Sequence, residues 1–241
     1  MVGFLLIDKP AGPTSHDIVD AVRRVTGEKR VGHAGTLDPF ATGLLIVGVG
    51  REATREFPKL VGLDKTYEAT MVLGATSDTQ DRTGRIEPTV FDSEVAQTRG
   101  AVSRQPSADE LRDAFMRFTG TIRQTPPMYS AKKVGGRKLY ELARQGIEVA
   151  REPVDVIVHA LELLSHDPPR ATIRVSCSSG TYIRTLAHDI GQALGCGAYL
   201  ETLRRTKIGP FDLSSSVPLA TLTKDAVSAH LQPVSTILSH I

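Results

Sequence analysis

Residues 30–43 read RVGHAGTLDPFATG, a glycine-rich loop that lies between two apolar stretches of the chain. Pro39 keeps the residue before it in an extended backbone conformation, which restricts the direction of the Asp38 carboxylate. The glycines let the backbone turn tightly or approach a ligand closely. An Asp-Pro pair is commonly a plain turn in which the carboxylate bonds its own backbone. The presence of His33 and several glycines in the same loop favours a functional site around Asp38.

The elements around this loop follow from hydrophobic periodicity, helix caps and turn residues. We expect strands at residues 2–7, 44–49, 67–73, 153–165 and 170–178. We expect helices at residues 14–27, 53–61, 107–118, 137–145, 181–194 and 219–231. Residues 31–43 are expected to form a loop, and residues 74–106 to be polar and irregular. Strands and helices intermix without a βαβ rhythm, which indicates an α+β fold with a mixed, mostly antiparallel sheet flanked by helices.

The composition is that of an ordinary globular protein. The chain has 241 residues, of which 40% are hydrophobic and 23% charged, and its net charge is +2. These values exclude disordered and collagen-like classes. The N-terminus lacks the basic region and cleavage site of a signal peptide, and residues 44–49 are too short to span a bilayer. Cys177 and Cys196 have no CxxC pattern, so we expect reduced thiols, no metal site and a cytoplasmic protein.

Charge is concentrated in one part of the chain. Residues 112–151 hold nine basic and three acidic residues, a local excess of six positive charges. Such a block is typical either of a solvated helix face or of a surface that contacts a polyanion. Prolines at 126–127 and glycines at 135–136 lie within the block and indicate a protruding loop rather than a helix face. The pattern therefore favours contact with a nucleic acid.

Three further side chains are candidates for a site, each with a plainer alternative. Arg184 follows a strand-to-helix junction, where it could pair with a buried carboxylate such as Asp38 or could be an ordinary surface arginine. His33 could stack on a base, although a lone histidine is more often a packed residue. Tyr67 opens an alternating strand and could belong to the core. The sequence has no GxxxxGK[ST] loop, so nucleotide hydrolysis is not indicated.

Five ordered segments, which extend from residue 8 to about residue 211, carry a resemblance to a known family. Residues 32–43 resemble the catalytic motif of the TruB family of bacterial tRNA pseudouridine-55 synthases. The other segments are Asp8-Lys9-Pro10-x-Gly12-x-Thr14-Ser15-His16, Lys65-x-Tyr67 with Asp78-Thr79-x-Asp81-x-x-Gly84, Gln124-x-Pro126-Pro127-x-Tyr129-Ser130-Ala131-x-Lys133, and Cys177-Ser178-x-Gly180-Thr181-Tyr182-Ile183-Arg184 followed by Leu203-Arg204-Arg205-Thr206. Residues 85–106 match the family poorly.

The resemblance implies an isomerase that converts the T-loop uridine at position 55 of tRNA to pseudouridine. The C1′–N1 bond breaks, the base turns within its pocket, and a C1′–C5 bond forms, without a cofactor or a metal. The resemblance implies that the catalytic residues are Asp38, Tyr67 and Arg184, with Asp38 as the essential carboxylate. It also implies substrate-pocket positions at His33, Tyr182 and Leu203, and RNA contacts from Lys132, Lys133, Arg137 and Arg144.

The resemblance also implies a domain organisation and a partner. We expect a pseudouridine synthase catalytic domain over residues 1–241, with an RNA-clamping insertion at 120–150 and a C-terminal helical segment at 212–241. A C-terminal RNA-binding domain of the PUA type, which many family members have, is not expected in this chain. The expected partner is the T-arm stem-loop of tRNA, bound by a monomer that contacts no membrane and needs no nucleotide cofactor.

Two other functions compete with this interpretation. A non-catalytic module that binds or folds tRNA could use the same scaffold. A glycoside hydrolase or base-releasing enzyme would generally need a second carboxylate, for which Asp8, Asp17 and Asp81 are the nearby candidates. None of the three has a convincing setting in the sequence, so both functions rank below the synthase.

Overall fold

The computed structural model describes residues 1–89, 105–130, 133–143 and 145–241. The chain forms two compact units, which are described one at a time. The first unit consists of Met1–Glu68 and Leu203–Ile241, and the second of Ala69–Thr202. Two long strands, β4 (Lys65–Leu73) and β12 (Ala198–Ile208), contribute residues to both units.

The first unit is built on a sheet with strand order β14-β1-β3-β12-β4, and β2 pairs with β3 as well. Its other strands are β1 (Gly3–Lys9), β2 (Val31–Ala34), β3 (Thr42–Val49) and β14 (Val217–Pro218). The β1–β3 and β2–β3 pairs are antiparallel, whereas β1–β14 and β3–β12 are parallel. The sheet is therefore mixed, as predicted.

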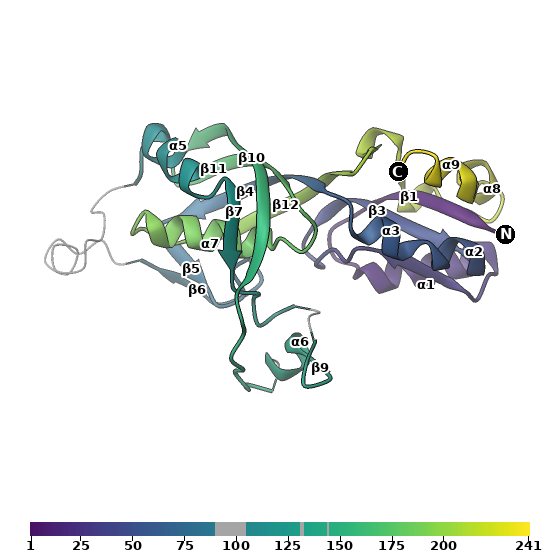
Figure 1. Ribbon diagram of the computed structural model, residues 1–241, viewed down its shortest axis with the longest axis horizontal. Helices are drawn as coiled ribbons and strands as arrows, with labels where there is room; N and C mark the ends of the chain where they lie inside the picture. The colour runs from purple at the N-terminus through teal and green to yellow at the C-terminus, as the bar shows by residue number, and fades with distance from the viewer. Residues whose placement is uncertain (90–104, 131–132, 144) are drawn as a thin grey trace, which may run out of the picture. The chain divides into compact units, whose positions relative to one another are not determined.

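Both faces of this sheet are buried. Leu5, Ile7, Leu45 and Val47 pack on one face against α1 (Ser15–Thr26). Phe4, Leu6, Leu44 and Ile46 pack on the other face against Ala53 of α2 (Gly50–Arg55) and Leu60 of α3 (Phe57–Val61). Figure 1 shows these helices along β1 and β3. Burial on both faces explains why the two strands read as continuous apolar runs rather than as alternating ones.

The second unit has the strand order β12-β4-β11-β10-β7. Its long hairpin consists of β10 (Val154–Asp167) and β11 (Arg170–Cys177), with β7 (Gly120–Gln124) antiparallel to the first half of β10. Alternate residues of β11, from Ala171 to Cys177, are buried. On the polar side the hydroxyls of Thr70 and Thr172 lie 3.3 Å apart. This one-sided burial is typical of an antiparallel sheet.

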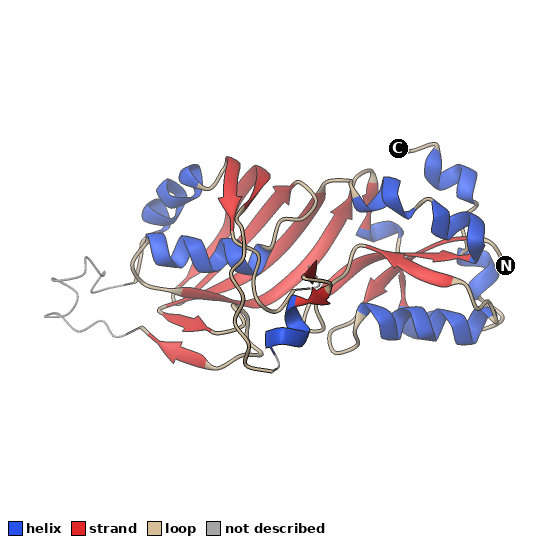
Figure 2. Cartoon of the chain, turned by 60° about the horizontal axis from the view of Figure 1, so that its bottom comes forward, coloured by secondary structure: helices blue, strands red, loops and turns tan. Residues whose placement is uncertain are grey.

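Two helices contribute buried residues to the core of the second unit. They are α5 (Ala108–Arg117) and α7 (Ile183–Ala193), and Figure 2 shows helices on one side of the long strands. A capping box of Ser107 and Glu110 opens α5, as the sequence predicted. In α7 the buried face includes Leu186 and Ile190. The predicted helix at 181–194 is thereby confirmed, with its start at Ile183.

Smaller elements complete the described chain. They are the hairpins β5 (Ala75–Ser77) with β6 (Ile86–Pro88) and β8 (Lys133–Val134) with β9 (Arg137–Lys138), the helices α6 (Leu139–Ala143), α8 (Val227–His230) and α9 (Val234–Leu238), the strand β13 (Phe211–Asp212), and the 3₁₀ turns Leu213–Ser215 and Leu219–Thr221. The predicted segment at 212–241 therefore contains short turns and helices.

Several sequence expectations were wrong in detail. Residues 31–34 form a strand rather than a loop, because Val31 and Ala34 are buried against β3. Residues 219–231 form a 3₁₀ turn at Leu219–Thr221 and the separate short helix α8 at Val227–His230 rather than one helix. The predicted helix at 137–145 begins only at Leu139, because Gly135 and Gly136 make a tight turn between β8 and β9. The predicted helix at 53–61 is two helices, with a proline in the first turn of the second.

A first prediction concerns the start of α1. The Thr14 hydroxyl accepts a hydrogen bond from the Asp17 N–H, and the Asp17 carboxylate accepts one from the Thr14 N–H. Thr14→Ala removes the first of these bonds, so we expect the free energy of unfolding to fall by about 1 kcal/mol in urea titrations. Thr236→Ala, at an exposed helical position of the same unit, is the matched control and should change it by less than about 0.5 kcal/mol.

Candidate functional site

Asp38 lies in the connection between β2 and β3, and it is partly buried. Its backbone carbonyl accepts a hydrogen bond from the Ala41 N–H at 3.1 Å, which closes a turn around Pro39. The Pro39 carbonyl accepts a second bond from the Gly12 N–H at 2.8 Å. Two hydrogen bonds therefore fix the backbone that follows Asp38.

Lys9, at the end of β1, bonds the backbone of this loop through its side chain. Its side chain is 0% exposed. Its ammonium group donates hydrogen bonds to three carbonyl oxygens, those of Ala41 at 2.7 Å, Pro10 at 3.0 Å and Pro39 at 3.3 Å. Burial lowers the pKa of Lys9 from 10.5 to about 8, while the Asp38 carboxylate raises it and the Arg205 guanidinium lowers it. A buried cation whose protons are all bonded ties β1 to the Asp38 loop.

Two more buried side chains hold the loop at other points. The Ser15 hydroxyl donates to the Leu37 carbonyl at 3.0 Å and accepts from the Leu37 N–H at 2.9 Å. Arg205 of β12, which is 1% exposed, donates to the carbonyls of Leu44 at 2.8 Å and Gly35 at 3.0 Å. Polar side chains from β1, α1 and β12 thus bond the backbone of the loop directly, which preorganises it.

Gly43 lets β12 approach the end of this loop. Its φ is +102°, in the left-handed region, and a Cβ at this position would lie 2.3 Å from the Arg205 carbonyl oxygen. A side chain here would therefore be strained and would also displace β12. Glycine is therefore needed at this position of the motif so that β12 can pack against the end of the loop.

His33, Tyr67 and Leu203, the other predicted site residues of the first unit, lie on its strands. Tyr67 and Leu203 are both buried, in β4 and β12. Next to Leu203, β12 pairs Arg204 with Thr42, and the Thr206 hydroxyl bonds the Thr66 carbonyl at 3.3 Å. The segment around Leu203 therefore lies between the end of the Asp38 loop and the start of β4. 

His33 in β2 is mostly a neutral imidazole near pH 7. Burial lowers its pKa, and the nearby Arg205 and His16 lower it further. Its Nδ1 atom is buried and has no hydrogen-bond partner in the described part of the chain. An uncharged ring in this position fits a packing or stacking role better than that of a charged group.

Arg184 lies in the second unit, in the first turn of α7, and is 4% exposed. Its guanidinium donates to the carbonyls of Thr79 and Tyr129, each at 2.8 Å, and lies 3.6 Å from a carboxylate oxygen of Asp81. The structure thus gives Arg184 a buried carboxylate partner, Asp81, within the second unit. The predicted pairing of Arg184 with Asp38 stays a prediction.

Asp81 is itself held by a tight turn of residues 77–84. One of its oxygens accepts hydrogen bonds from the Thr79 hydroxyl at 2.9 Å and from the Thr83 N–H at 2.8 Å. A Cβ at Gly84 would lie 2.1 Å from a side-chain oxygen of Asp78, so a larger residue here would have to displace that side chain. The turn leaves the second oxygen of Asp81 directed at Arg184.

Tyr182 and the predicted RNA contacts also lie in the second unit. Tyr182 is the partly buried N-cap residue of α7. Arg137 is exposed, and its guanidinium donates to the Gln145 side-chain oxygen at 2.9 Å, which is a neutral partner. Lys133 lies in β8. Lys132 and Arg144 lie outside the described residues.

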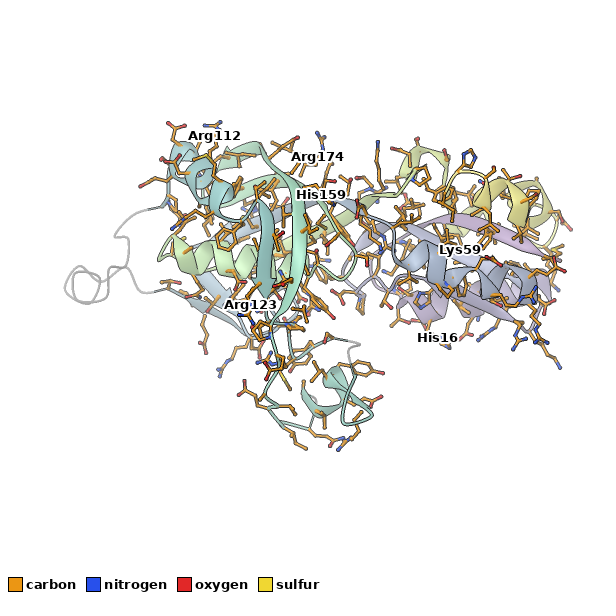
Figure 3. All side chains as sticks on the ribbon, viewed as in Figure 1. His16, Lys59, Arg112, Arg123, His159 and Arg174 are labelled. Atoms are coloured by element: carbon orange, nitrogen blue, oxygen red, sulfur yellow. The ribbon has the colours of Figure 1, made fainter. Side chains whose placement is uncertain are left out.

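Other arginines of the second unit form ion pairs with carboxylates. Arg112 lies 2.8 Å from Asp109, and Arg174 lies 3.5 Å from Glu162. Arg123 lies 4.0 Å from Asp155. Figure 3 shows these three arginines on the outside of the unit. Exposed pairs of this kind contribute little to stability, and they add little net charge to the surface.

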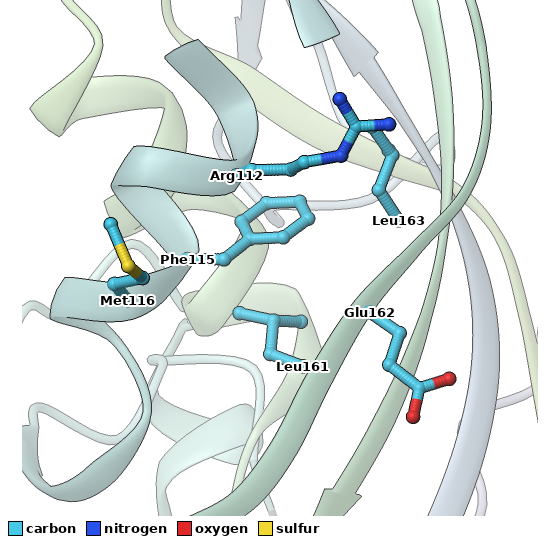
Figure 4. Close-up of a pocket in the computed structure, with 6 residues that line it drawn as sticks. All are labelled: Arg112, Phe115, Met116, Leu161, Glu162 and Leu163. Carbon is cyan, nitrogen blue, oxygen red and sulfur yellow. The ribbon is translucent and has the colours of Figure 1, made fainter. Parts of the chain in front are cut away.

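A pocket of about 260 Å³ lies between α5 and β10. Its lining residues, shown in Figure 4, are Arg112, Phe115, Met116, Leu161, Glu162 and Leu163. None of them belongs to the motifs that the sequence singled out. The pocket is therefore distinct from the candidate site.

Two kinds of feature are absent from the described ranges. There, no group of three or more His, Cys, Asp or Glu residues is arranged to hold a metal ion. Across the same residues, no helix is both long enough and apolar enough to cross a membrane.

Comparison with solved structures defines the class of protein. The chain superposes on a structure titled "Crystal Structure of a Cbf5-Nop10-Gar1 Complex" with a TM-score of 0.75 and 28% identity, covering 99% of this chain and 62% of that one. A second structure, titled "Structure of H/ACA RNP bound to a substrate RNA containing 2'-deoxyuridine", gives a TM-score of 0.70 and 26% identity, covering 99% and 61%. The chain thus spans about three fifths of these solved chains. The α+β fold is that of a pseudouridine synthase, as predicted.

Sequence comparison then gives the family. A family model described as "TruB family pseudouridylate synthase (N terminal domain)" matches residues 23–183, and "tRNA pseudouridylate synthase B C-terminal domain" matches residues 184–239. A Geobacter sulfurreducens protein named tRNA pseudouridine synthase B is 47% identical over 97% of this chain and 73% of its own length. Its namesake from Bordetella pertussis is 48% identical over 91% of this chain and 86% of its own length. The chain belongs to the TruB family of pseudouridylate synthases.

Some residues that shape the candidate site were not predicted as site residues. In the sequence, Lys9, Arg205 and Gln124 appear only as members of the motifs, and Asp81 appears there and as a weak candidate for a second carboxylate. The available signal was their place in those motifs. All four side chains are buried. Each has its polar atoms bonded to the backbone, or paired with a charged side chain, near a predicted site residue.

A second prediction concerns Lys9. Because the folded chain binds the Lys9 proton more weakly than the unfolded chain, its contribution to stability rises with pH between about 8 and 10.5. Below about pH 8 the cost of the buried charge is fully present. The free energy of unfolding of the wild type minus that of Lys9→Met should therefore increase over this interval in urea titrations. A difference in the free energy of unfolding that does not change with pH would contradict the lowered pKa of Lys9.

A third prediction concerns the Asp81–Arg184 pair. Asp81→Asn leaves the Arg184 charge buried without its carboxylate, while the amide oxygen can still accept the hydrogen bonds of the turn. We expect the free energy of unfolding to fall by about 3 kcal/mol, the low end for breaking a buried ion pair. Asp109→Asn, in the exposed pair with Arg112, is the control and should cost less than about 1 kcal/mol. Equal effects at the two sites would refute the assignment.

Proposed function

We propose that this chain isomerises a uridine of tRNA to pseudouridine, and that the target is the T-loop uridine at position 55. Membership of the TruB family and relatives named tRNA pseudouridine synthase B support the reaction and the substrate. The observation that carries the proposal is the Asp38 loop, in which buried Lys9, Ser15 and Arg205 fix the backbone that presents one carboxylate.

The reaction needs little more than a positioned carboxylate. The C1′–N1 bond of the uridine breaks, the base turns, and C1′ joins C5; the proton on C5 is lost while N1 gains one. Asp38 can add covalently to the sugar or the base, or remove a proton at C2′, and both routes use its ionised form. Neither route transfers electrons or a phosphoryl group, so no cofactor is assigned.

The other predicted residues have separate roles in this proposal. Water at the reacting centre would turn isomerisation into loss of the base, so Tyr67, Tyr182 and Leu203 would exclude it, and His33 would contact the base. Arg184 would act with Asp38 on the reacting uridine. Flipping the uridine out of its stack costs a few kcal/mol, which the phosphate contacts of the insertion would offset. Those contacts are assigned to Lys132, Lys133, Arg137 and Arg144.

The cellular context is part of the same proposal. The protein would act as a monomer in the cytoplasm on the T-arm stem-loop of tRNA. Residues 1–241 would work as one catalytic domain, with 120–150 as the clamp on the RNA. The exposed position of Arg137, whose hydrogen-bond partner Gln145 is neutral, supports that assignment.

A fourth prediction tests the reaction. In a tRNA transcript tritiated at C5 of uridine, the wild type should release tritium to solvent, and Asp38→Asn should reduce release to background while still binding the RNA. Asp225→Asn, at an exposed aspartate of the same unit, is the control and should behave as the wild type does. Replacing the uridine at position 55 by cytidine should abolish release.

Other results would select the competing functions. Tight binding by the wild type without any tritium release would mean a non-catalytic tRNA-binding or tRNA-folding module. Free uracil among the products, detected by chromatography, would mean a base-releasing enzyme.

A further inference from the structure

The first turn of α7 carries two predicted site residues, Tyr182 and Arg184, yet it begins without the usual cap. Tyr182 is the N-cap residue, with φ −95° and ψ 105°, and its side chain makes no capping hydrogen bond. Helices are commonly fixed at this position by Ser, Thr, Asp or Asn, whose short side chains bond the free N–H groups. The position of this turn must therefore be set from outside the helix.

Gln124 fixes the position of the first turn of α7 from one side. Gln124 is the last residue of β7, where its backbone pairs with Val154 of β10, and it is 1% exposed. Its amide N–H donates to the Tyr182 carbonyl at 3.0 Å, and its side-chain oxygen accepts from the Tyr182 N–H at 2.7 Å. The side-chain amide thus pairs with the Tyr182 backbone as a neighbouring strand would. The pair anchors the start of α7 to the sheet of the second unit.

Gln80 holds the same turn from the other side. Its side-chain oxygen accepts a hydrogen bond from the hydroxyl of buried Thr185 at 2.8 Å. Among the described residues Gln80 is the only one other than glycine with a positive φ, 63°. A left-handed backbone at such a residue is unfavourable and persists only where its surroundings enforce it. One such constraint is the hydrogen bond that the Leu200 N–H of β12 donates to the Gln80 backbone carbonyl at 3.0 Å.

Arg184 lies between Tyr182, which Gln124 bonds, and Thr185, which bonds Gln80. Its acceptors, the carbonyls of Thr79 and Tyr129, belong to the segments that carry Gln80 and Gln124. The guanidinium is a rigid planar fork, so a small displacement of the helix start would misalign all of its bonds together. Gln124 and Tyr129 also lie at the beginning of the predicted RNA-clamping insertion. The segment assigned to grip the RNA is therefore bonded to the turn that presents Arg184.

We propose that Gln124 is a positioning residue for the isomerisation, which sets the first turn of α7 so that Tyr182 and Arg184 meet the reacting uridine. Gln80 supplies the second hold on that turn. Gln124 itself touches no substrate; it acts through the Tyr182 backbone. The inference rests on the proposed function and adds to it a residue for which the family resemblance implied no role.

The fifth prediction uses Gln124→Met, which keeps the volume of the side chain and removes both hydrogen bonds. A displacement of about 1 Å at a catalytic group can cost about a hundredfold in rate, so kcat for tritium release should fall by about tenfold to a hundredfold. KM should change by less than about threefold, because phosphate contacts dominate RNA affinity. Gln192→Met, on the exposed side of the same helix, is the matched control and should change neither.

Gln124→Glu separates positioning from mere folding. A protonated carboxyl group can donate to the Tyr182 carbonyl and accept from the Tyr182 N–H, as the amide does, whereas a carboxylate can only accept. Burial raises the pKa of a carboxyl group, so the glutamate would titrate nearer to neutral pH. The ratio of the variant's kcat to that of the wild type should therefore rise as the pH falls from 8 to 6. This test also serves if Gln124→Met fails to fold.

Each outcome decides something. If the wild type releases tritium and both Gln124 variants keep its kcat at every pH, the positioning inference is wrong and the proposed function stands. A folded Gln124→Glu with reduced kcat but a ratio independent of pH would also overturn the inference. Absence of tritium release from the wild type would overturn the proposed function and the inference with it.

Discussion

Two buried cations, Lys9 and Arg205, bond the backbone of the loop that carries Asp38, and the first unit is arranged around this constraint. Removing a charge from water is costly unless every proton is bonded, and here the acceptors are main-chain carbonyls rather than acids. The loop thereby gains fixed donors for its carbonyls. The close approach of Arg205 requires glycine at position 43. A carboxylate fixed in this way pays little reorganisation cost during a reaction.

Arg184 shows the same device in the second unit. It is a buried cation with two carbonyl acceptors and a carboxylate partner, Asp81, which a tight turn orients. Its helix begins at a tyrosine that cannot cap it, and side-chain amides of two glutamines bond the turn instead. The chain therefore uses buried side chain-to-backbone hydrogen bonds both at the Asp38 loop and at the first turn of α7. In the proposed isomerisation, rigid placement of a few groups would be the main contribution of the protein.

The sequence predicted elements well where one signal sufficed. β1 and β3 follow from apolar runs, and α1 follows from its capping box and from Gly27, which ends it in a left-handed conformation. The expectations from the sequence failed where contact with a distant segment decides the secondary structure. Residues 31–34 become a strand only because β3 offers its edge, and β12 was missed because a fully buried arginine interrupts its apolar alternation. For the site, Pro39 marked Asp38, but nothing local marked Lys9 as a partner of its loop.

By itself, the sequence determined the fold class, the family and the loop with its aspartate, because hydrophobic periodicity, glycine and proline act over a few residues and motifs keep their order along the chain. Only the tertiary structure decided which polar side chains are buried and what they bond. Lys9 lies 32 positions from its acceptor Ala41, Gln124 lies 58 from Tyr182, and Arg205 lies 170 from Gly35. A cation or an amide becomes a structural tie only when folding removes its water, and that removal depends on packing between segments distant in the sequence.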